Sequence, residues 1–192
     1  HDFYVEAHPD WAPLGAAHFK ELVNEGYYTD LRFFRVIKGF MAQFGMHGDP
    51  EVNKKYGSQK IMDDTPIQSN TRGYLSFATS GPNSRTTQLF INFGKNSYLD
   101  KSGFAPFGVV VGNGMDIVDR VYSGYGEGAP SGKGPSQGRI GQQGNTFLDS
   151  DFPKLSHIVS VEIVGDDAAH VNVLEGEGVE ELTKLALRKA VH

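Results

Sequence analysis

The chain has 192 residues, 39% of them hydrophobic, and a formal net charge of −5 at pH 7. This length fits one domain, or one domain with a tail, and the composition is that of an ordinary globular protein. The acidic balance and the lack of a basic run argue against nucleic-acid binding, and the absence of cysteine excludes disulfides and thiol chemistry. No apolar run reaches the roughly 18 residues of a membrane helix.

The first part of the chain predicts a strand, a helix and a long polar connection. Residues 2–8 alternate between apolar and polar side chains, which is typical of an edge or barrel strand. Pro13 suits the first turn of a helix, and apolar residues at helical spacing up to Gly26 predict a helix over residues 13–25. Residues 46–71 are polar and rich in turn signals, so we interpret them as a surface excursion.

The segment between them, residues 33–45, combines apolar and aromatic side chains with one guanidinium and one carboxamide. Residues 33–37 predict a buried strand in which Phe33, Arg35 and Ile37 share one face. An arginine beside apolar neighbours needs an acceptor, because a buried charge without a partner is costly. That acceptor can be structural or a ligand, and the residues alone favour a structural salt bridge.

The rest of the chain reads as short strands with few helices. We expect the following elements in chain order: strands 74–79 and 87–93, an apolar run 109–111, a short helix 115–122, a glycine-rich loop 124–144, a strand 157–164 and a C-terminal amphipathic helix 179–190. Many short strands without regular helix alternation predict a β-barrel or sandwich.

Two patterns that could indicate cofactors fail on inspection. The run Gly124–Gly128 resembles a nucleotide fingerprint, but Ala129 stands at the third glycine position and no buried strand leads into the run. The histidines are scattered without metal-ligand spacing at positions 1, 8, 18, 47, 157, 170 and 192. We therefore expect no metal ion and no cofactor.

One group of residues is compatible with ligand binding. Apolar side chains accompany one arginine and two amides in the set Arg35, Phe40, Met41, Gln43, Gln88, Phe90, Leu99 and Phe104. Such a site cannot transfer protons near neutral pH, but it can bind a small apolar group beside a carbonyl. The alternative is that these residues simply form core, as most clusters of aromatic residues and methionine do.

Three stretches resemble the cyclophilin peptidyl-prolyl isomerases. Residues 34–43 read FRVIKGFMAQ and resemble the signature F-H-R-x-I-x-G-F-M-x-Q-G. Residues 77–91 resemble M-A-x-A-G-P-N-T followed by S-Q-F-F-I, and the helix with Pro13 and Phe19 resembles V-P-x-T-x-x-N-F. The likeness covers about residues 3–164, and the segment 124–152 resembles a divergent, bacterial-type branch.

The resemblance implies a mainly β fold, an eight-stranded antiparallel barrel capped by helices. The family's first strand has no counterpart here, because residues 2–8 resemble its second strand. We expect a cyclophilin-like isomerase domain over residues 1–166 and a C-terminal extension over residues 167–192. The chain begins at His1 inside an expected strand, so we expect that preceding residues, which can include a targeting segment, are absent from this sequence. The compartment is not indicated.

Site residues follow from the matched positions. The resemblance makes Arg35 the catalytic residue, and it implies that substrate is bound by Phe40, Met41, Gln43, Ala78, Thr79, Gln88, Phe90, Tyr98, Leu99 and Phe104. Two of these depart from the family, since Tyr98 replaces a tryptophan that hydrogen-bonds cyclosporin and Phe104 replaces a histidine. The segment 46–62 does not align well enough to transfer a role.

The implied function is acceleration of X–Pro isomerisation in protein folding. Its partners would be proline-containing peptides and unfolded proteins, with weak cyclosporin binding, and we expect a monomer. The alternative is a non-catalytic module that binds proline-containing peptides, or a structural subunit of a larger assembly. The intact Arg35, Phe40, Gln43 and Phe90 favour the enzyme.

Overall fold

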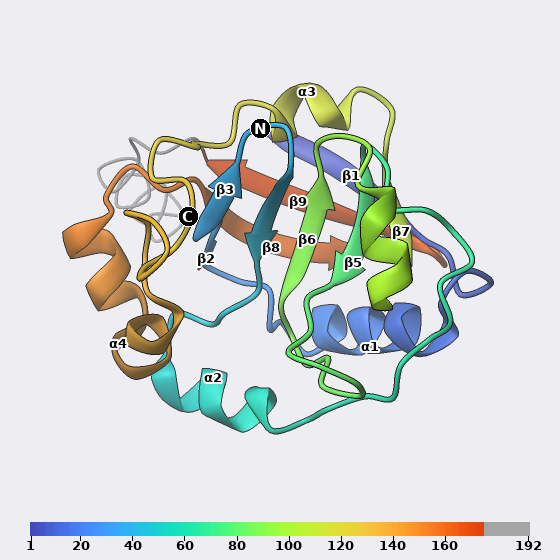
Figure 1. The fold of residues 1–192 in the computed structure, drawn as a ribbon, viewed down its shortest axis with the longest axis horizontal. Coiled ribbons are helices and arrows are strands. Elements are labelled where there is room, and N and C mark those ends of the chain that lie inside the picture. Colours follow the sequence, from blue (N-terminus) through green and yellow to red (C-terminus); the bar gives the residue numbers. More distant parts are fainter. Residues whose placement is uncertain (175–192) are drawn as a thin grey trace, which may run out of the picture.

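The computed structural model describes residues 1–174 and consists mainly of antiparallel strands with helices around them (Figure 1). The strands are β1 (Asp2–Ala7), β2 (Leu31–Arg32), β3 (Arg35–Ile37), β4 (Met41–Phe44), β5 (Tyr74–Phe77), β6 (Leu89–Asn92), β7 (Gly108–Val111), β8 (His157–Ile163) and β9 (Ala168–Leu174). The helices are α1 (Pro13–Asn24), α2 (Pro50–Gly57), the 3-10 helix η1 (Ser97–Ser102), α3 (Gly114–Val118) and α4 (Gln137–Asp151). No helix within residues 1–174 is long and apolar enough to cross a membrane.

All nine strands belong to one sheet, in the order β2-β8-β9-β1-β7-β5-β6-β4-β3. The two edge strands, β2 and β3, are separated in the chain only by Phe33 and Phe34. Both edges of the sheet are therefore brought together, and the sheet curls back on itself as a barrel. The predicted mainly β, antiparallel class is confirmed. Counted as one interrupted strand, β2 and β3 reduce the nine strands to eight, and these eight include β9, which we did not predict.

Strand β9 lies between β8 and β1 and pairs with both. Val171 stands opposite Phe3 on one side and Val161 on the other. Its alternate residues Ala169, Val171 and Val173 are buried, as expected for one face of a strand against a core. The sheet thus continues past residue 166, and the helix expected over residues 179–190 lies outside the described residues.

The prediction that Phe33, Arg35 and Ile37 lie on one face of a strand is wrong. Phe33 packs in the main core, Phe34 packs in a second cluster, and Val36 again points into the main core. Arg35 and Ile37 are only partly buried, so they do not share a face with Phe33. The reason is that the chain crosses here from one sheet edge to the other. The N–H of Phe33 still donates to Ser156 O beside β8, at 3.0 Å, and β3 begins two residues later.

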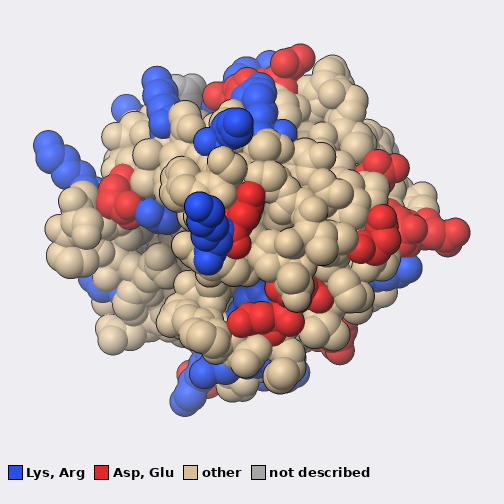
Figure 2. Space-filling view, turned by 45° about the vertical axis from the view of Figure 1, so that its right-hand side comes forward, with Lys and Arg blue, Asp and Glu red and all other residues tan. Residues whose placement is uncertain are grey.

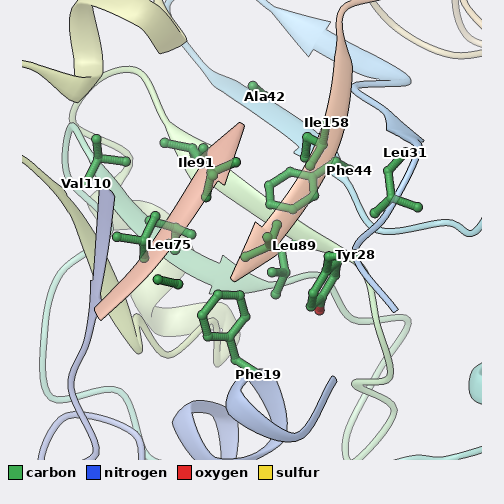
Figure 3. Close-up of a cluster of buried hydrophobic side chains, with 14 of the residues drawn as sticks. Phe19, Tyr28, Leu31, Ala42, Phe44, Leu75, Leu89, Ile91, Val110 and Ile158 are labelled. Carbon is green, nitrogen blue, oxygen red and sulfur yellow. The ribbon is translucent and has the colours of Figure 1, made fainter. Parts of the chain in front are cut away.

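The main core lies inside the curled sheet (Figure 3). In this view Phe19 of α1 points toward Leu75 and Leu89, while Tyr28 and Phe44 lie beside them. Helix α1 begins at Pro13, as predicted, and its buried residues include Ala16, Phe19, Leu22 and Val23 at helical spacing. The predicted helix 115–122 is shorter in the structure, where α3 spans Gly114–Val118.

The predicted loop 124–144 is wrong from residue 137 onward, because α4 occupies Gln137–Asp151. Glycines lower the helix propensity of this stretch, but burial of Ile140, Phe147 and Leu148 in the second cluster outweighs that cost. The helix is kinked at Gly144, where φ is 58°. It packs against α2, which lies within the expected surface excursion 46–71.

Candidate active site

A groove of about 310 Å³ lies where β3, β4 and β6 meet η1, α4 and the turn after β5. Its lining consists of Arg35, Phe40, Met41, Gln43, Ala78, Thr79, Ser80, Ser84, Thr86, Gln88, Phe90, Leu99, Phe104 and Gln137. The structure thus brings together every predicted site residue except Tyr98. The serines, Thr86 and Gln137 are additional lining residues that we did not predict.

The register of the sheet sets up a polar row across this groove. Arg35 on β3 stands opposite Gln43 on β4, and Gln43 stands opposite Phe90 on β6. Nη1 of Arg35 donates to Oε1 of Gln43 at 2.9 Å, and Nε2 of Gln43 donates to Oε1 of Gln88 at 2.8 Å. Gln88 in turn donates to Oε1 of Gln137 on α4 at 3.3 Å. Cross-strand neighbours of this kind lie close enough for their side chains to interact.

An apolar pocket adjoins the polar row. Met41 and Phe90 are buried, and the ring of Phe90 meets that of Phe104 edge-on, with 5.6 Å between the centroids. Phe40 and Leu99 complete this part of the lining. The Cζ atom of Arg35 lies 6.0 Å from the centroid of the Phe40 ring. An apolar group in the pocket would therefore sit directly beside a guanidinium.

Tyr98 lies at the rim rather than in the groove lining. Its side chain is exposed, at 60% of its maximal area. The ring stacks on Phe40 with 6.3 Å between the centroids and 23° between the planes. This contact places Tyr98 next to a wall residue of the groove.

The acceptor that Arg35 requires is Glu127, from the glycine-rich segment before α4. Nε of Arg35 donates to Oε1 of Glu127 and Nη2 donates to Oε2, both at 2.7 Å. The hydrogen bonds from Arg35 lower the pKa of the Glu127 carboxyl below its ordinary value. The structural salt bridge favoured by the sequence is thus present, and the guanidinium also lines the groove. The sequence pointed to a carboxylate partner for Arg35, but nothing in it singled out Glu127.

The chemistry available in the groove is limited. Its lining contains no histidine and no carboxylate, and Arg35 is the one ionisable side chain among the lining residues. Within residues 1–174, no group of three or more His, Cys, Asp or Glu side chains could hold a metal ion. Figure 2 shows Lys and Arg interspersed with Asp and Glu on the face in view. The groove can bind and orient a ligand, but the residues that line it offer no general base near neutral pH.

A family model described as cyclophilin type peptidyl-prolyl cis-trans isomerase/CLD matches residues 1–141. The chain belongs to this family of isomerases. The predicted resemblance to the family is confirmed.

Curated relatives carry the name of the same activity. The chain is 32% identical over 174 residues to peptidyl-prolyl cis-trans isomerase B of Escherichia coli K12, covering 86% of this chain and 94% of that protein. It is 37% identical over 123 residues to a peptidyl-prolyl cis-trans isomerase of Acinetobacter baylyi, covering 61% of this chain but only 64% of that protein.

A solved structure supports the fold. A cyclophilin-type isomerase of Cryptosporidium parvum, crystallised in the presence of the dipeptide Ala-Pro, has a TM-score of 0.53 and 24% identity to this chain. The match covers 70% of this chain and 85% of that one. At this identity the likeness establishes the fold alone.

Proposed function

We propose that this cyclophilin-family chain accelerates cis–trans isomerisation of X–Pro bonds, with Arg35 as the catalytic residue. The observation that carries the proposal is the position of the guanidinium on the wall of a groove, directly beside an apolar pocket. Neither an acid, a base nor a nucleophile is required for this reaction, and the groove lining has no histidine or carboxylate that could act as a general base.

The reaction needs only a site that favours the twisted amide. Amide resonance sets a rotational barrier of about 18–20 kcal/mol, and X–Pro isomers that differ little in free energy exchange over tens of seconds or longer. Twisting localises a lone pair on the prolyl nitrogen. A guanidinium that is always charged can donate to that nitrogen, and Arg35 is such a donor.

The apolar pocket supplies the second half of the mechanism. A proline ring seated among Phe40, Met41, Phe90 and Leu99 would exclude water from the reacting amide. Excluding water strengthens the hydrogen bond from a preorganised donor. Gln43 would help to hold the guanidinium, because it accepts from Nη1.

The substrates that fit this groove are proline-containing peptides and unfolded chains. Gln88, Ala78 and Thr79 line the groove beyond the pocket, where they can contact the peptide on either side of the proline. A Cryptosporidium parvum relative was crystallised in the presence of Ala-Pro, which is the minimal ligand of this class. Cyclosporin should bind weakly, because Tyr98 stands at the rim where the family usually has tryptophan.

Replacing Arg35 tests the proposal. In Arg35→Ala the donor to the twisted amide is lost, so we expect kcat on a short X–Pro peptide to fall by roughly 30- to 900-fold, equivalent to about 2–4 kcal/mol. Arg35→Lys should recover little, because an ammonium lacks the planar fork. Arg72→Ala is a suitable control, since Arg72 is an exposed arginine that also forms a bidentate pair with a carboxylate, Asp119.

Two outcomes would refute the proposal. Wild-type turnover in a folded Arg35→Ala variant would show that the guanidinium is not the catalytic group. Peptide binding without any acceleration by the wild-type protein would instead identify the non-catalytic binding module. Rates of isomerisation and a separate peptide titration distinguish these cases.

A further inference from the structure

The glycine-rich segment that fails as a nucleotide-binding motif carries Glu127 to the guanidinium of Arg35. We propose that Glu127 is a positioning residue for isomerisation, which holds Arg35 in the orientation that reaches the twisted amide. The inference rests on the proposed role of Arg35 as the catalytic residue. It assigns a role in the reaction to a loop that lies 92 residues further along the chain than Arg35.

The loop is folded tightly around Glu127. The N–H of Gly134 donates to Glu127 O at 2.7 Å, and the N–H of Gly128 donates to Oε1 of the Glu127 carboxylate at 2.8 Å. A Cβ atom at Gly132 would collide with Glu127 O, and one at Gly134 would lie only 2.9 Å from the same oxygen. Glycine at these two positions is therefore needed for the close approach. The loop thus fixes the backbone of Glu127 and gives its carboxylate one hydrogen bond, from Gly128.

The geometry of the pair leaves part of the guanidinium available. Arginine has five N–H donors, and Glu127 takes those on the edge formed by Nε and Nη2. Gln43 takes one N–H of Nη1, and the Met41 sulfur lies 4.0 Å from the same nitrogen. Within residues 1–174, Nη2 donates to Glu127 alone, although it carries two N–H groups. With 25% of the Arg35 side chain exposed, the contact orients the guanidinium without covering it.

Orientation matters here because an arginine side chain is long and flexible. It carries about 2 kcal/mol of rotamer entropy, and a donor that must be ordered in the transition state loses part of its effect. Gln43 alone provides a single hydrogen bond to Arg35. Two parallel bonds to a carboxylate fix the plane of the guanidinium as well as its position. Glu127 therefore acts on the catalytic step through Arg35 and has no need to touch the substrate.

The test compares Glu127→Ala and Glu127→Gln in the full-length chain. For Glu127→Ala we expect a kcat about tenfold below wild type, because a misplacement of about 1 Å can cost up to about 100-fold in rate. Glu127→Gln should lie between this variant and the wild type, since it keeps one acceptor oxygen for Arg35 but replaces the other with an amide NH2, which cannot accept a hydrogen bond. The dissociation constant of the peptide, measured by direct titration, should not change in either variant.

A matched control is Asp119→Ala, which removes a carboxylate from another bidentate arginine pair outside the groove lining. It should leave kcat unchanged. The same Glu127→Ala substitution is then made in the Arg35→Ala background. If Glu127 acts only through Arg35, it should produce no further loss of turnover there.

The outcomes separate this inference from the function on which it rests. Wild-type turnover in Arg35→Ala would overturn the proposed function, whatever Glu127 does. A slow Arg35→Ala together with a Glu127→Ala variant of wild-type rate would overturn the positioning role alone. A faster Glu127→Ala would show instead that the carboxylate competes with the substrate for Arg35. An equal loss in both backgrounds would show that Glu127 supports the loop but not the guanidinium.

Discussion

Asp64 should be among the most sensitive positions for stability, although it lies outside the groove lining. Its carboxylate and the guanidinium of Arg85 are both only 4% exposed and lie 3.1 Å apart. The same carboxylate accepts from the backbone N–H of Leu14 at 3.1 Å and of Gly15 at 2.8 Å, at the start of α1. The N-cap residue of this helix, Ala12, provides no side-chain hydrogen bond. Asp64 thus caps a helix from 50 residues away and neutralises a buried arginine.

The expected cost follows from these contacts. Removing one partner of a buried ion pair costs about 3–5 kcal/mol when the other charge stays buried and unpaired. Arg85 would keep a contact of 3.7 Å with the carboxylate of Asp63, whose side chain is 41% exposed, so we expect a cost at the lower end of that range. The loss of a helix cap by itself costs about 1 kcal/mol. The two effects share the same carboxylate, so we expect the free energy of unfolding of Asp64→Ala to fall by about 4 kcal/mol. For a chain of this size that corresponds to a Tm about 8–16 °C lower.

Urea unfolding followed by the fluorescence of Trp11, the one tryptophan of the chain, measures this change. Asp119→Ala is the exposed comparison and should cost about 1 kcal/mol or less. The double variant Asp64→Leu/Arg85→Met should be more stable than Asp64→Ala, because it leaves no unpaired charge inside. If the free energy of unfolding of Asp64→Ala lies within 1 kcal/mol of the wild-type value, the buried pair does not stabilise the fold in this way.

Two further predictions concern pH and ligand binding. Burial, together with the nearby charge of Arg32, lowers the pKa of His157 to about 4. As the pH falls below 6.5, His157 is protonated in the unfolded chain but stays neutral in the native state. The free energy of unfolding should therefore fall by up to about 3 kcal/mol between pH 6.5 and pH 4. Urea midpoints at pH 7 and 5 should differ less in His157→Gln than in the wild type, and an equal difference would contradict this assignment. Tyr98→Trp should tighten inhibition by cyclosporin more than it changes turnover, because Tyr98 stacks on Phe40 at the rim of the groove. Equal inhibition constants for the wild type and Tyr98→Trp would show that position 98 does not contact the inhibitor.

Sequence patterns predicted those elements whose structure depends mainly on residues close together in the chain. Pro13 and the spacing of apolar residues after it were enough to place α1. Helix α4 was missed because the spacing of Ile140, Phe147 and Leu148 is interrupted by glycines, and burial against a second cluster overrides their low helix propensity. Strand β9 was missed although its apolar residues Ala169, Val171 and Val173 alternate with polar ones. Its place in the sheet depends on pairing with β1 and β8, which are distant in the sequence.

In the site, too, residues within one local motif could be predicted, whereas a residue placed by the whole fold could not. Arg35 and Gln43 lie in one signature and face each other across neighbouring strands, so a sequence motif could predict both. Glu127 comes from a loop whose path depends on the whole fold, and the sequence required only that Arg35 have some acceptor. The run Gly124–Gly128 only superficially resembles a nucleotide fingerprint, and we predicted no phosphate binding there, but glycines do allow a close approach to the backbone. In the structure Gly132 and Gly134 serve that purpose, but the group that approaches is the carbonyl oxygen of Glu127. A glycine pattern thus indicates that something comes close, and only the fold shows that here it is the residue that holds the arginine.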